Sequence, residues 1–423
     1  MFSILWPLSR EVAARVRERF PKMPIILGGE HGTAVYENVL ATSEYDIVVM
    51  GEGEETFLAV LDAIEGCKPL GDISGIAFQE DEKIIFTGFA VRKREVDEIP
   101  VPDWGSFPLE EYIVRHQANG INIGRSMSIL ATRGCPYNCT FCSNPSMWRR
   151  RWIPRSPQSV VEEIELHMKL YSVTNFDFQD LTAIIKRKWI VEFCGEIIKR
   201  DLGITWQMPS GTRAEAFDEE IAGLLYASGC RALGFAPESG DRDMLVEIEK
   251  KVNLDNMRVS MRAALNAGIK LSCFFVIGFP NETKASLKNT LRLLRRLAFL
   301  GIHDVSVSKF IPYPGSRLFM ELQEKGKIAL DDEFFTSPMD FYSKAAASCA
   351  EGISAGKLHR TMIWMYLNFY ILSFLFRPQR VARVMFIAIT KGREETRYAK
   401  WFIDRFVTRK HWRDLTATRS TSG

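Results

Sequence analysis

The sequence of 423 residues lacks the features that mark secreted and nucleic-acid-binding proteins. Its first twenty residues contain an acidic residue, Glu11, and no small-residue cleavage site, so we expect no secretory signal. Its net charge is only +3, which argues against a chain that binds nucleic acid over its whole surface. We therefore expect a cytoplasmic protein that binds no nucleic acid.

Apolar runs long enough to span a membrane are also absent. The most apolar stretch, residues 362–376, is about 15 residues long, whereas a spanning helix needs roughly 20. We interpret it as a buried or interfacial helix, with peripheral membrane contact as the alternative. Residues 377–419 then carry twelve Lys and Arg against four acidic residues. That stretch is either a solvated helical face or a surface for an anionic partner or polyanionic substrate.

Paired cysteines are scarce as well. Five of the eight cysteines stand alone in the sequence, which fits free thiols in a reducing compartment better than a disulfide framework. The other three, Cys135, Cys139 and Cys142, fall within the eight residues CPYNCTFC. Three thiolates can bind three irons of a [4Fe–4S] cluster and leave the fourth iron open. A closed zinc site is the alternative, but it needs a fourth ligand, and no Cys or His pair lies nearby to supply one.

Alternating strand and helix patterns indicate an α/β protein with parallel sheets. Residues 1–70 contain two strand–turn–helix units, and Gly28, Gly29, Gly51 and Gly53 follow the two strands. Ligands of open α/β sheets bind at such strand ends. Residues 71–123 contain a predicted hairpin and a proline-rich linker, and we place the domain boundary near 110–124. A longer α/β region (124–328) and a mostly helical region (329–423) follow.

Six strand–helix units are predicted in the longer region, enough for a partial (β/α)6 TIM-like barrel. The predicted strands are 127–132, 174–180, 204–209, 232–237, 271–278 and 304–310, and the predicted helices are 157–171, 187–199, 217–228, 255–267 and 284–299. The three cysteines directly follow the first strand. Chemistry in such barrels sits at the carboxyl ends of the strands, so this is where a catalytic loop is expected.

The C-x3-C-x2-C spacing after the first strand of a six-unit βα region resembles the radical SAM superfamily. The resemblance covers roughly residues 124–325. It implies that Cys135, Cys139 and Cys142 bind a [4Fe–4S] cluster whose open iron is chelated by S-adenosylmethionine (SAM). One-electron cleavage of SAM would then give a 5′-deoxyadenosyl radical.

Further motifs match the SAM-binding positions of that superfamily, one after another along the chain. They lie in FDFQDLT (176–182), SGTRAE (210–215), GFAPESG (234–240) and FFVIGFPNET (274–283), and PYPGSRLF (312–319) resembles the usual exit from the sixth strand. The resemblance implies SAM contacts by the following residues: Phe141 near the adenine, Asp180 near the amino group, Arg213, Glu238 at the ribose, and Ile277 with Gly278 near the adenine.

The N-terminal region resembles the later half of a cobalamin-binding Rossmann domain. The matching residues are Ser3 in SIL, Gly28 and Gly29, and Gly51 and Gly53 in GEGEETF. The resemblance implies that they contact cobalamin. In that family an earlier D-x-H-x-x-G segment supplies a histidine that can ligate cobalt, and this sequence has no such segment. We therefore expect a truncated Rossmann-like domain.

The order of these regions is similar to radical SAM methyltransferases and to the anaerobic magnesium-protoporphyrin monomethyl ester cyclase branch. It implies methyl transfer or oxidative rearrangement of a small molecule, lipid-like or tetrapyrrole, with a reducing partner such as flavodoxin or ferredoxin. Two alternatives stay open. One is a non-catalytic iron–sulfur remnant. The other is a methylthiotransferase-like RNA-modifying enzyme, which would usually carry three more cysteines before the first strand, where only Cys67 stands.

Overall fold

The computed structural model describes residues 2–66, 68–117, 119–212, 217–336 and 348–391. The strands are β1 (Ile26–Gly28), β2 (Ile47–Val49), β3 (Ile76–Glu80), β4 (Lys83–Phe86), β5 (Ser126–Ile129), β6 (Thr132–Arg133), β7 (Ile153–Pro154), β8 (Asn175–Phe178), β9 (Thr205–Thr212), β10 (Cys230–Glu238), β11 (Lys270–Ile277) and β12 (Asp304–Lys309). The α-helices are α1 (Trp6–Arg19), α2 (Glu30–Thr42), α3 (Glu54–Ile64), α4 (Leu109–Val114), α5 (Asn144–Trp148), α6 (Pro157–Tyr171), α7 (Arg187–Lys199), α8 (Glu219–Ala227), α9 (Arg242–Glu247), α10 (Leu254–Asn266), α11 (Lys284–Leu300), α12 (Arg317–Glu324), α13 (Asp332–Thr336), α14 (Ala355–Phe376) and α15 (Pro378–Lys391).

The N-terminal sheet has four strands in the order β1-β2-β3-β4. The first two are parallel, as the strand–helix alternation predicts, and β3 and β4 form the predicted hairpin. Asp81 and Glu82 turn that hairpin with positive φ angles of 45° and 62°, the backbone of a tight two-residue turn. Strand β3 also pairs antiparallel with β2. The hairpin therefore extends the N-terminal sheet, which its sequence pattern did not predict.

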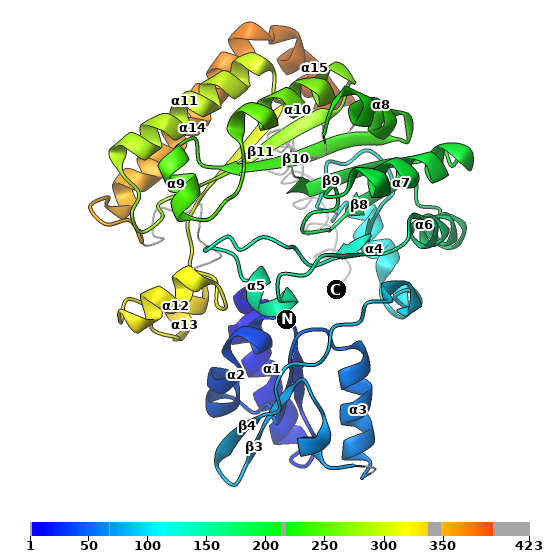
Figure 1. Ribbon diagram of the computed structural model, residues 1–423, viewed down its shortest axis with the longest axis vertical. Coiled ribbons are helices and arrows are strands. Elements are labelled where there is room, and N and C mark those ends of the chain that lie inside the picture. Colours follow the sequence, from blue (N-terminus) through cyan, green and yellow to red (C-terminus); the bar gives the residue numbers. More distant parts are fainter. Residues whose placement is uncertain (1, 67, 118, 213–216, 337–347, 392–423) are drawn as a thin grey trace, which may run out of the picture.

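The second sheet has six parallel strands in the order β12-β11-β10-β9-β8-β5. All six predicted strands are present. The strand β11 shows why they form one sheet: every second residue is buried, and Cys273, Phe275 and Ile277 join the core under the helices. Aromatic contacts within this core join Phe178, Phe193 and Trp206 from β8, α7 and β9. Figure 1 shows α6, α7, α8, α10 and α11 along the outside of this sheet.

Helix α14 covers the edge strand β12 and packs on α11. The Tyr366 hydroxyl accepts a hydrogen bond from the Val307 amide (2.8 Å) and donates one to the Val307 carbonyl (3.0 Å). A tyrosine thus binds the backbone groups that a further strand would bind. Exposed edges invite pairing with other chains, and covering them with a helix is a common protection.

After the six-stranded sheet, the chain returns to the N-terminal domain (Figure 1). Phe319 of α12 and Phe335 of α13 are buried in one cluster with Trp6, Val39 and Val48 of the N-terminal domain. The Phe335 ring meets the edge of His31 at 5.3 Å between centroids. The core of the N-terminal domain is therefore completed by residues about 300 positions later in the chain.

The apolar stretch at 362–376 lies within α14, which has two different faces. Met362, Met365 and Phe369 are buried against the sheet and α11. A second set of large apolar side chains on this helix is exposed: Ile363, Trp364, Leu367, Ile371, Leu375 and Phe376. Within the described ranges, every helix is too short or too polar to cross a membrane.

Candidate functional site

The three cysteines lie in a loop between β6 and α5 that we call the cysteine loop, residues 134–143. Figure 1 shows α5 between the N-terminal sheet and the six-stranded sheet. The loop begins at Gly134, whose φ is +79°. A Cβ at this position would lie 2.1 Å from the Arg151 carbonyl oxygen, so only glycine fits there.

All three thiols of the loop are partly exposed and free of disulfides. Burial raises the pKa of Cys142 to about 12, opposed by hydrogen bonds from Asn144 and increased by the nearby Cys139 and Cys135 thiols. The three sulfurs are therefore close enough to influence one another electrostatically. Among the described residues, no three His, Cys, Asp or Glu side chains converge on a point where one metal ion could bind. A [4Fe–4S] cluster differs from a single ion in that each cysteine binds its own iron, so three neighbouring cysteines outside disulfides fit it.

Phe141 connects the cysteine loop to the carboxyl end of β11. Its ring packs on Phe279 at 5.6 Å between centroids. The two predicted residues just before Phe279 are differently placed. The Ile277 side chain is fully buried in the core, whereas Gly278 has a φ of +90° and donates its amide to Glu282 (3.1 Å).

Glu238 lies at the carboxyl end of β10, where the pairing register shifts. Its φ is +62°, an uncommon conformation for a residue with a side chain. Its carboxylate is buried and pairs with Lys250 Nζ at 2.9 Å. The cysteine loop binds the same segment, because Asn138 donates to Glu249 (2.9 Å) and the Thr140 amide donates to the Ile248 carbonyl (3.0 Å).

Asp180 lies just beyond β8 and is buried. One carboxylate oxygen accepts from the Ala131 amide (3.1 Å) and the other from the Thr132 hydroxyl (2.5 Å). Burial raises its pKa to about 6, and these hydrogen bonds oppose the rise. Asp180 therefore fixes the chain immediately before the cysteine loop, and both of its oxygens already have partners within the chain.

The structure thus gathers Phe141, Asp180, Glu238, Ile277 and Gly278 at one edge of the six-stranded sheet, around the cysteine loop. Each lies at or beyond the carboxyl end of its strand or in the loop itself. The predicted Arg213 lies outside the described residues.

The glycines of the N-terminal domain also lie at strand ends. Gly28 ends β1 and Gly51 follows β2 with a φ of +72°. A Cβ at Gly28 would meet no atom within 4 Å, and one at Gly51 would lie 3.8 Å from the Met147 carbonyl oxygen of α5. This glycine-lined edge is open at Gly28, whereas at Gly51 it lies against the segment after the cysteine loop.

The other predicted residues of this domain flank that edge. Gly29 has a φ of +96° and Gly53 precedes α3. The Ser3 hydroxyl is hydrogen-bonded to His31 Nδ1 at 3.0 Å. His31 is fully buried beside Trp6, and burial lowers its pKa to about 4.

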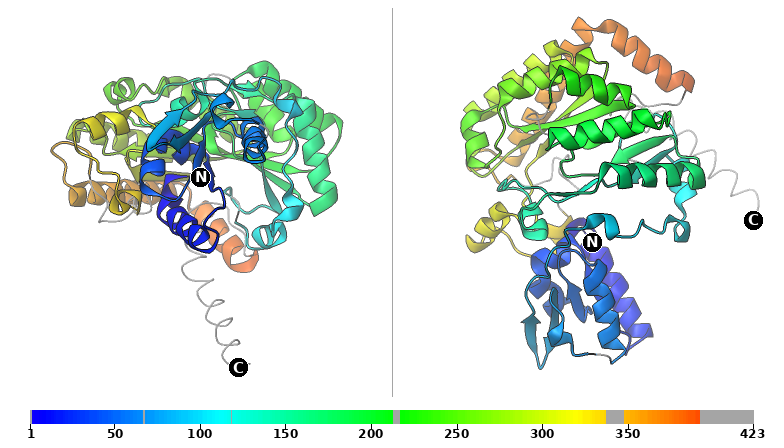
Figure 2. Two further views of the ribbon diagram at one scale, coloured as in Figure 1. Left: turned by 90° about the horizontal axis from the view of Figure 1, so that it is seen from below. Right: turned by 45° about the vertical axis from the view of Figure 1, so that its right-hand side comes forward.

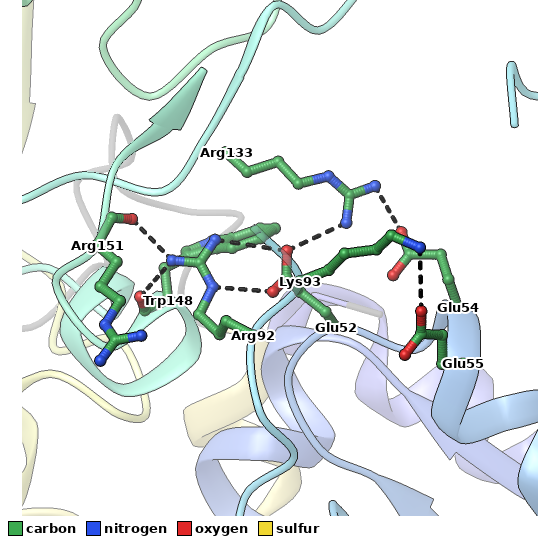
Figure 3. Close-up of polar contacts among 8 residues, drawn as sticks. All are labelled: Glu52, Glu54, Glu55, Arg92, Lys93, Arg133, Trp148 and Arg151. Atoms are coloured by element: carbon green, nitrogen blue, oxygen red, sulfur yellow. Dashed lines mark hydrogen bonds and ion pairs between the residues drawn. The ribbon is translucent and has the colours of Figure 1, made fainter. Parts of the chain in front are cut away.

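Glu52, between Gly51 and Gly53, connects the N-terminal domain to residues on both sides of the cysteine loop (Figure 3). It accepts hydrogen bonds from Arg92 Nε (2.8 Å) and from Arg133 Nη1 (3.2 Å). Arg92 also donates to the carbonyls of Trp148 (2.8 Å) and Arg151 (2.7 Å). Arg133 directly precedes Gly134 and also pairs with Glu54 at 2.5 Å.

Sequence reasoning missed Lys250, Thr132 and the residues around Glu52. No sequence signal identifies Arg92, which follows an extended segment and acts on residues more than fifty positions later. Glu282 could have been predicted, since it lies four residues after Gly278 in the motif FFVIGFPNET.

Comparison with known proteins identifies the second sheet region. The model of the radical SAM superfamily matches residues 129–294, which include the cysteine loop and strands β8 to β11. Residues 129–294 form a radical SAM domain. Enzymes of this superfamily use a [4Fe–4S] cluster and SAM.

Two curated relatives and one solved structure extend this result. The chain is 31% identical over 317 residues to the anaerobic magnesium-protoporphyrin IX monomethyl ester cyclase of Rubrivivax gelatinosus, covering 74% of this chain and 55% of the relative. It is 29% identical over 299 residues to an uncharacterized methyltransferase of Pyrococcus horikoshii, covering 70% of this chain and 62% of that protein. The chain thus spans little more than half the length of these relatives.

The radical SAM methyltransferase TsrM from Kitasatospora setae, solved with cobalamin and a [4Fe–4S] cluster, has a similar fold. The TM-score is 0.63 at 19% identity, over 76% of this chain and 61% of that one. At that identity, the likeness concerns the fold.

Proposed function

We propose that this chain is a radical SAM enzyme in which Cys135, Cys139 and Cys142 hold a [4Fe–4S] cluster. The observation that carries the proposal is the placement of three neighbouring cysteines, none of them in a disulfide, at the carboxyl edge of a six-stranded parallel sheet. These three cysteines would hold the cluster, which would supply one-electron reduction of SAM for radical chemistry on the substrate. A low-potential donor such as flavodoxin or ferredoxin would supply the electron.

The residues around the cysteine loop would bind and orient SAM. Glu238, held by Lys250, presents a carboxylate suited to ribose hydroxyls. Phe141 and the backbone at Ile277 and Gly278 supply a surface for the adenine. Asp180 would act by positioning residues 131–132, since its oxygens are occupied there. Arg213 remains part of the proposal on its sequence motif.

We further propose that the glycine-lined edge of the N-terminal domain binds cobalamin. Ser3, Gly28, Gly29, Gly51 and Gly53 would contact it. The open space at Gly28 supports a cofactor at this edge. The substrate would be a small molecule, lipid-like or tetrapyrrole, undergoing methyl transfer or oxidative rearrangement. The relatives' names support these two reaction types.

The test is anaerobic reconstitution with iron and sulfide, followed by product analysis with SAM and a strong one-electron reductant. We expect a four-iron cluster and 5′-deoxyadenosine from the natural chain. The test variant is Cys142→Ala, and its matched control is Cys349→Ala, because only Cys142 belongs to the cysteine loop. A cluster without 5′-deoxyadenosine would instead favour a non-catalytic iron–sulfur protein. Formation of S-adenosylhomocysteine only when cobalamin is present would support methyl transfer.

We also propose peripheral contact with an anionic membrane through α11, α14 and α15. These three helices contain no Asp or Glu, although 52 of the 423 residues are acidic. Their exposed side chains include Lys288, Arg292 and Arg296 on α11 and Trp364 and Leu367 on α14. Figure 2 shows α15 at the end of the molecule away from the N-terminal domain. An apolar strip among cations suits a monotopic contact.

Co-sedimentation with vesicles tests the membrane contact. We expect binding to phosphatidylglycerol vesicles, weakened in Trp364→Ser and unchanged in the control Val246→Ser, whose side chain is also exposed but lies on α9. Equal sedimentation of both variants would count against the proposal. Self-association in the absence of lipid, lost in Trp364→Ser, would assign the strip to a second copy of the chain.

A further inference from the structure

A charge cluster with a buried centre connects three separate segments of the chain beside the cysteine loop (Figure 3). It comprises Glu52 and Glu54 of the N-terminal domain, Arg92 of the segment after β4, and Arg133 at the end of β6. The side chains of Glu52 and Arg92 are only 10% and 5% exposed. The buried charges of Glu52 and Arg92 compensate each other, and Arg133 with the partly exposed Glu54 adds a second ion pair beside them.

Arg92 holds the carboxyl end of residues 134–151, the segment that contains the cysteine loop and α5. Helix α5 ends where Arg149 and Arg150 adopt positive φ angles of 49° and 55°, and the last carbonyls there lack helical partners. Arg92 Nη1 donates to the carbonyl of Trp148, the last helical residue, and to that of Arg151, three residues beyond it. Its guanidinium also lies over the Trp148 ring, 5.2 Å from the centroid.

Arg133 holds the amino end of the same segment. It is the residue before Gly134, and its side chain reaches across to Glu52 and Glu54. The Arg151 carbonyl that Arg92 binds is also the atom that excludes a side chain at Gly134. Both ends of residues 134–151 are therefore fixed through Glu52, in a turn flanked by Gly51 and Gly53.

We propose that Glu52 is a positioning residue for the cluster site. Through Arg92 and Arg133 it makes the geometry of the three cysteines depend on the docking of the N-terminal domain. The turn that contains Glu52 is also the turn proposed to meet cobalamin, so occupancy of the glycine-lined edge and the arrangement of the cysteines are coupled. The role of the cysteines in this statement rests on the proposed function, whereas the mechanical link does not.

Amide hydrogen exchange of residues 134–151 in the metal-free protein tests the link by itself. The variant is Glu52→Gln, which keeps the size of the side chain and removes its charge. The matched control is Glu55→Gln, three residues away in the first turn of α3, whose exposed carboxylate pairs with Lys93. We expect Glu52→Gln to accelerate exchange in this segment by about tenfold or more, because charge-assisted hydrogen bonds are lost, and Glu55→Gln to leave it unchanged. Equal exchange in the two variants would overturn the link.

A second variant guards against a general loss of folding. Arg92→Lys keeps the positive charge but replaces the forked guanidinium, whose separate nitrogens bind Glu52 and the two carbonyls, by a single nitrogen. It should accelerate exchange in residues 134–151 while exchange in β10 and β11 stays at the level of the natural chain. Acceleration of exchange throughout both sheets would show that the charge cluster serves overall stability alone, and it would overturn the positioning role.

The electron paramagnetic resonance spectrum of the reduced cluster, with and without SAM, tests the effect on the cysteines. We expect Glu52→Gln to alter the spectral change that SAM causes, and Glu55→Gln to retain it. An unaltered change in Glu52→Gln would overturn the effect on the cluster site. Failure of the natural chain to bind a four-iron cluster would refute the proposed function instead, and the exchange experiment on metal-free protein would still decide the link.

Discussion

Asp180 illustrates how a residue predicted from a motif acquires a more exact role in the structure. The motif places an acid after the second strand of the radical SAM region, and an acid is found there. The packing shows that its carboxylate fastens Ala131 and Thr132, just before the cysteine loop. A sequence pattern identifies the position, but the partners of a buried side chain depend on tertiary packing.

Replacing Asp180 by Asn should change how stability depends on pH. The pKa of Asp180 is about 6 in the folded chain and near 3.9 in an unfolded one. Its contribution to stability is thus fully present below about pH 4 and is lost as the pH rises through 6. Relative to Asp180→Asn, the natural chain should lose on the order of 2–3 kcal/mol between pH 4 and 7.

Urea unfolding of the metal-free proteins at several pH values checks this expectation. Asp62→Asn, on the N-terminal helix α3, provides a comparison at an exposed carboxylate. A stability difference between the natural chain and Asp180→Asn that stays constant from pH 4 to 7 would contradict the raised pKa.

The elements themselves were largely predictable. The six strands of the radical SAM region and the helices α6 and α7 match their predictions, because each carries a regular burial pattern in its own sequence. The hairpin was also predicted, but its pairing with β2 was not, since pairing depends on a partner strand nearly thirty residues away. The short helix α9 was missed because six residues give too little periodicity.

Helix α14 supplies a prediction at this scale. Tyr366→Phe removes the hydroxyl that binds both backbone groups of Val307 at the edge of β12. We expect a loss of about 1–3 kcal/mol, because two backbone groups lose their partner, and faster exchange of the Val307 amide. Tyr112→Phe, an exposed tyrosine on α4, should change neither. Unchanged protection of Val307 would show that the edge is held by packing alone.

At the scale of the whole molecule, the core of the N-terminal domain includes residues of α12 and α13, which follow the six-stranded sheet in the chain. The contact of α12 and α13 with this domain could not be predicted from the sequence, because it joins regions about 300 residues apart. The same limit applies to Arg92 and Glu52. The open glycine edge, in contrast, was predicted from the positions of its glycines after two strands.

Phe335→Ala should therefore destabilise the N-terminal domain. The side chain is 1% exposed and packs on Trp6 and His31, and removing such a ring typically costs about 3–5 kcal/mol. Hydrogen exchange should accelerate in α1 and β1 more than in β10 and β11. The neighbouring Phe334→Ala, at a partly buried position, is the comparison and should have the smaller effect. Uniform acceleration would mean that the two regions unfold together.

The tyrosine contact at the edge of β12 also has a consequence for biosynthesis. Helix α14 ends at Phe376, about 70 residues after β12, so the edge strand leaves the ribosome well before the helix that covers it. At about 5–20 residues per second, this interval lasts roughly 3–14 seconds. During that time the nascent sheet presents an unpaired parallel edge. Slowing translation between the two elements should therefore increase the demand for chaperones.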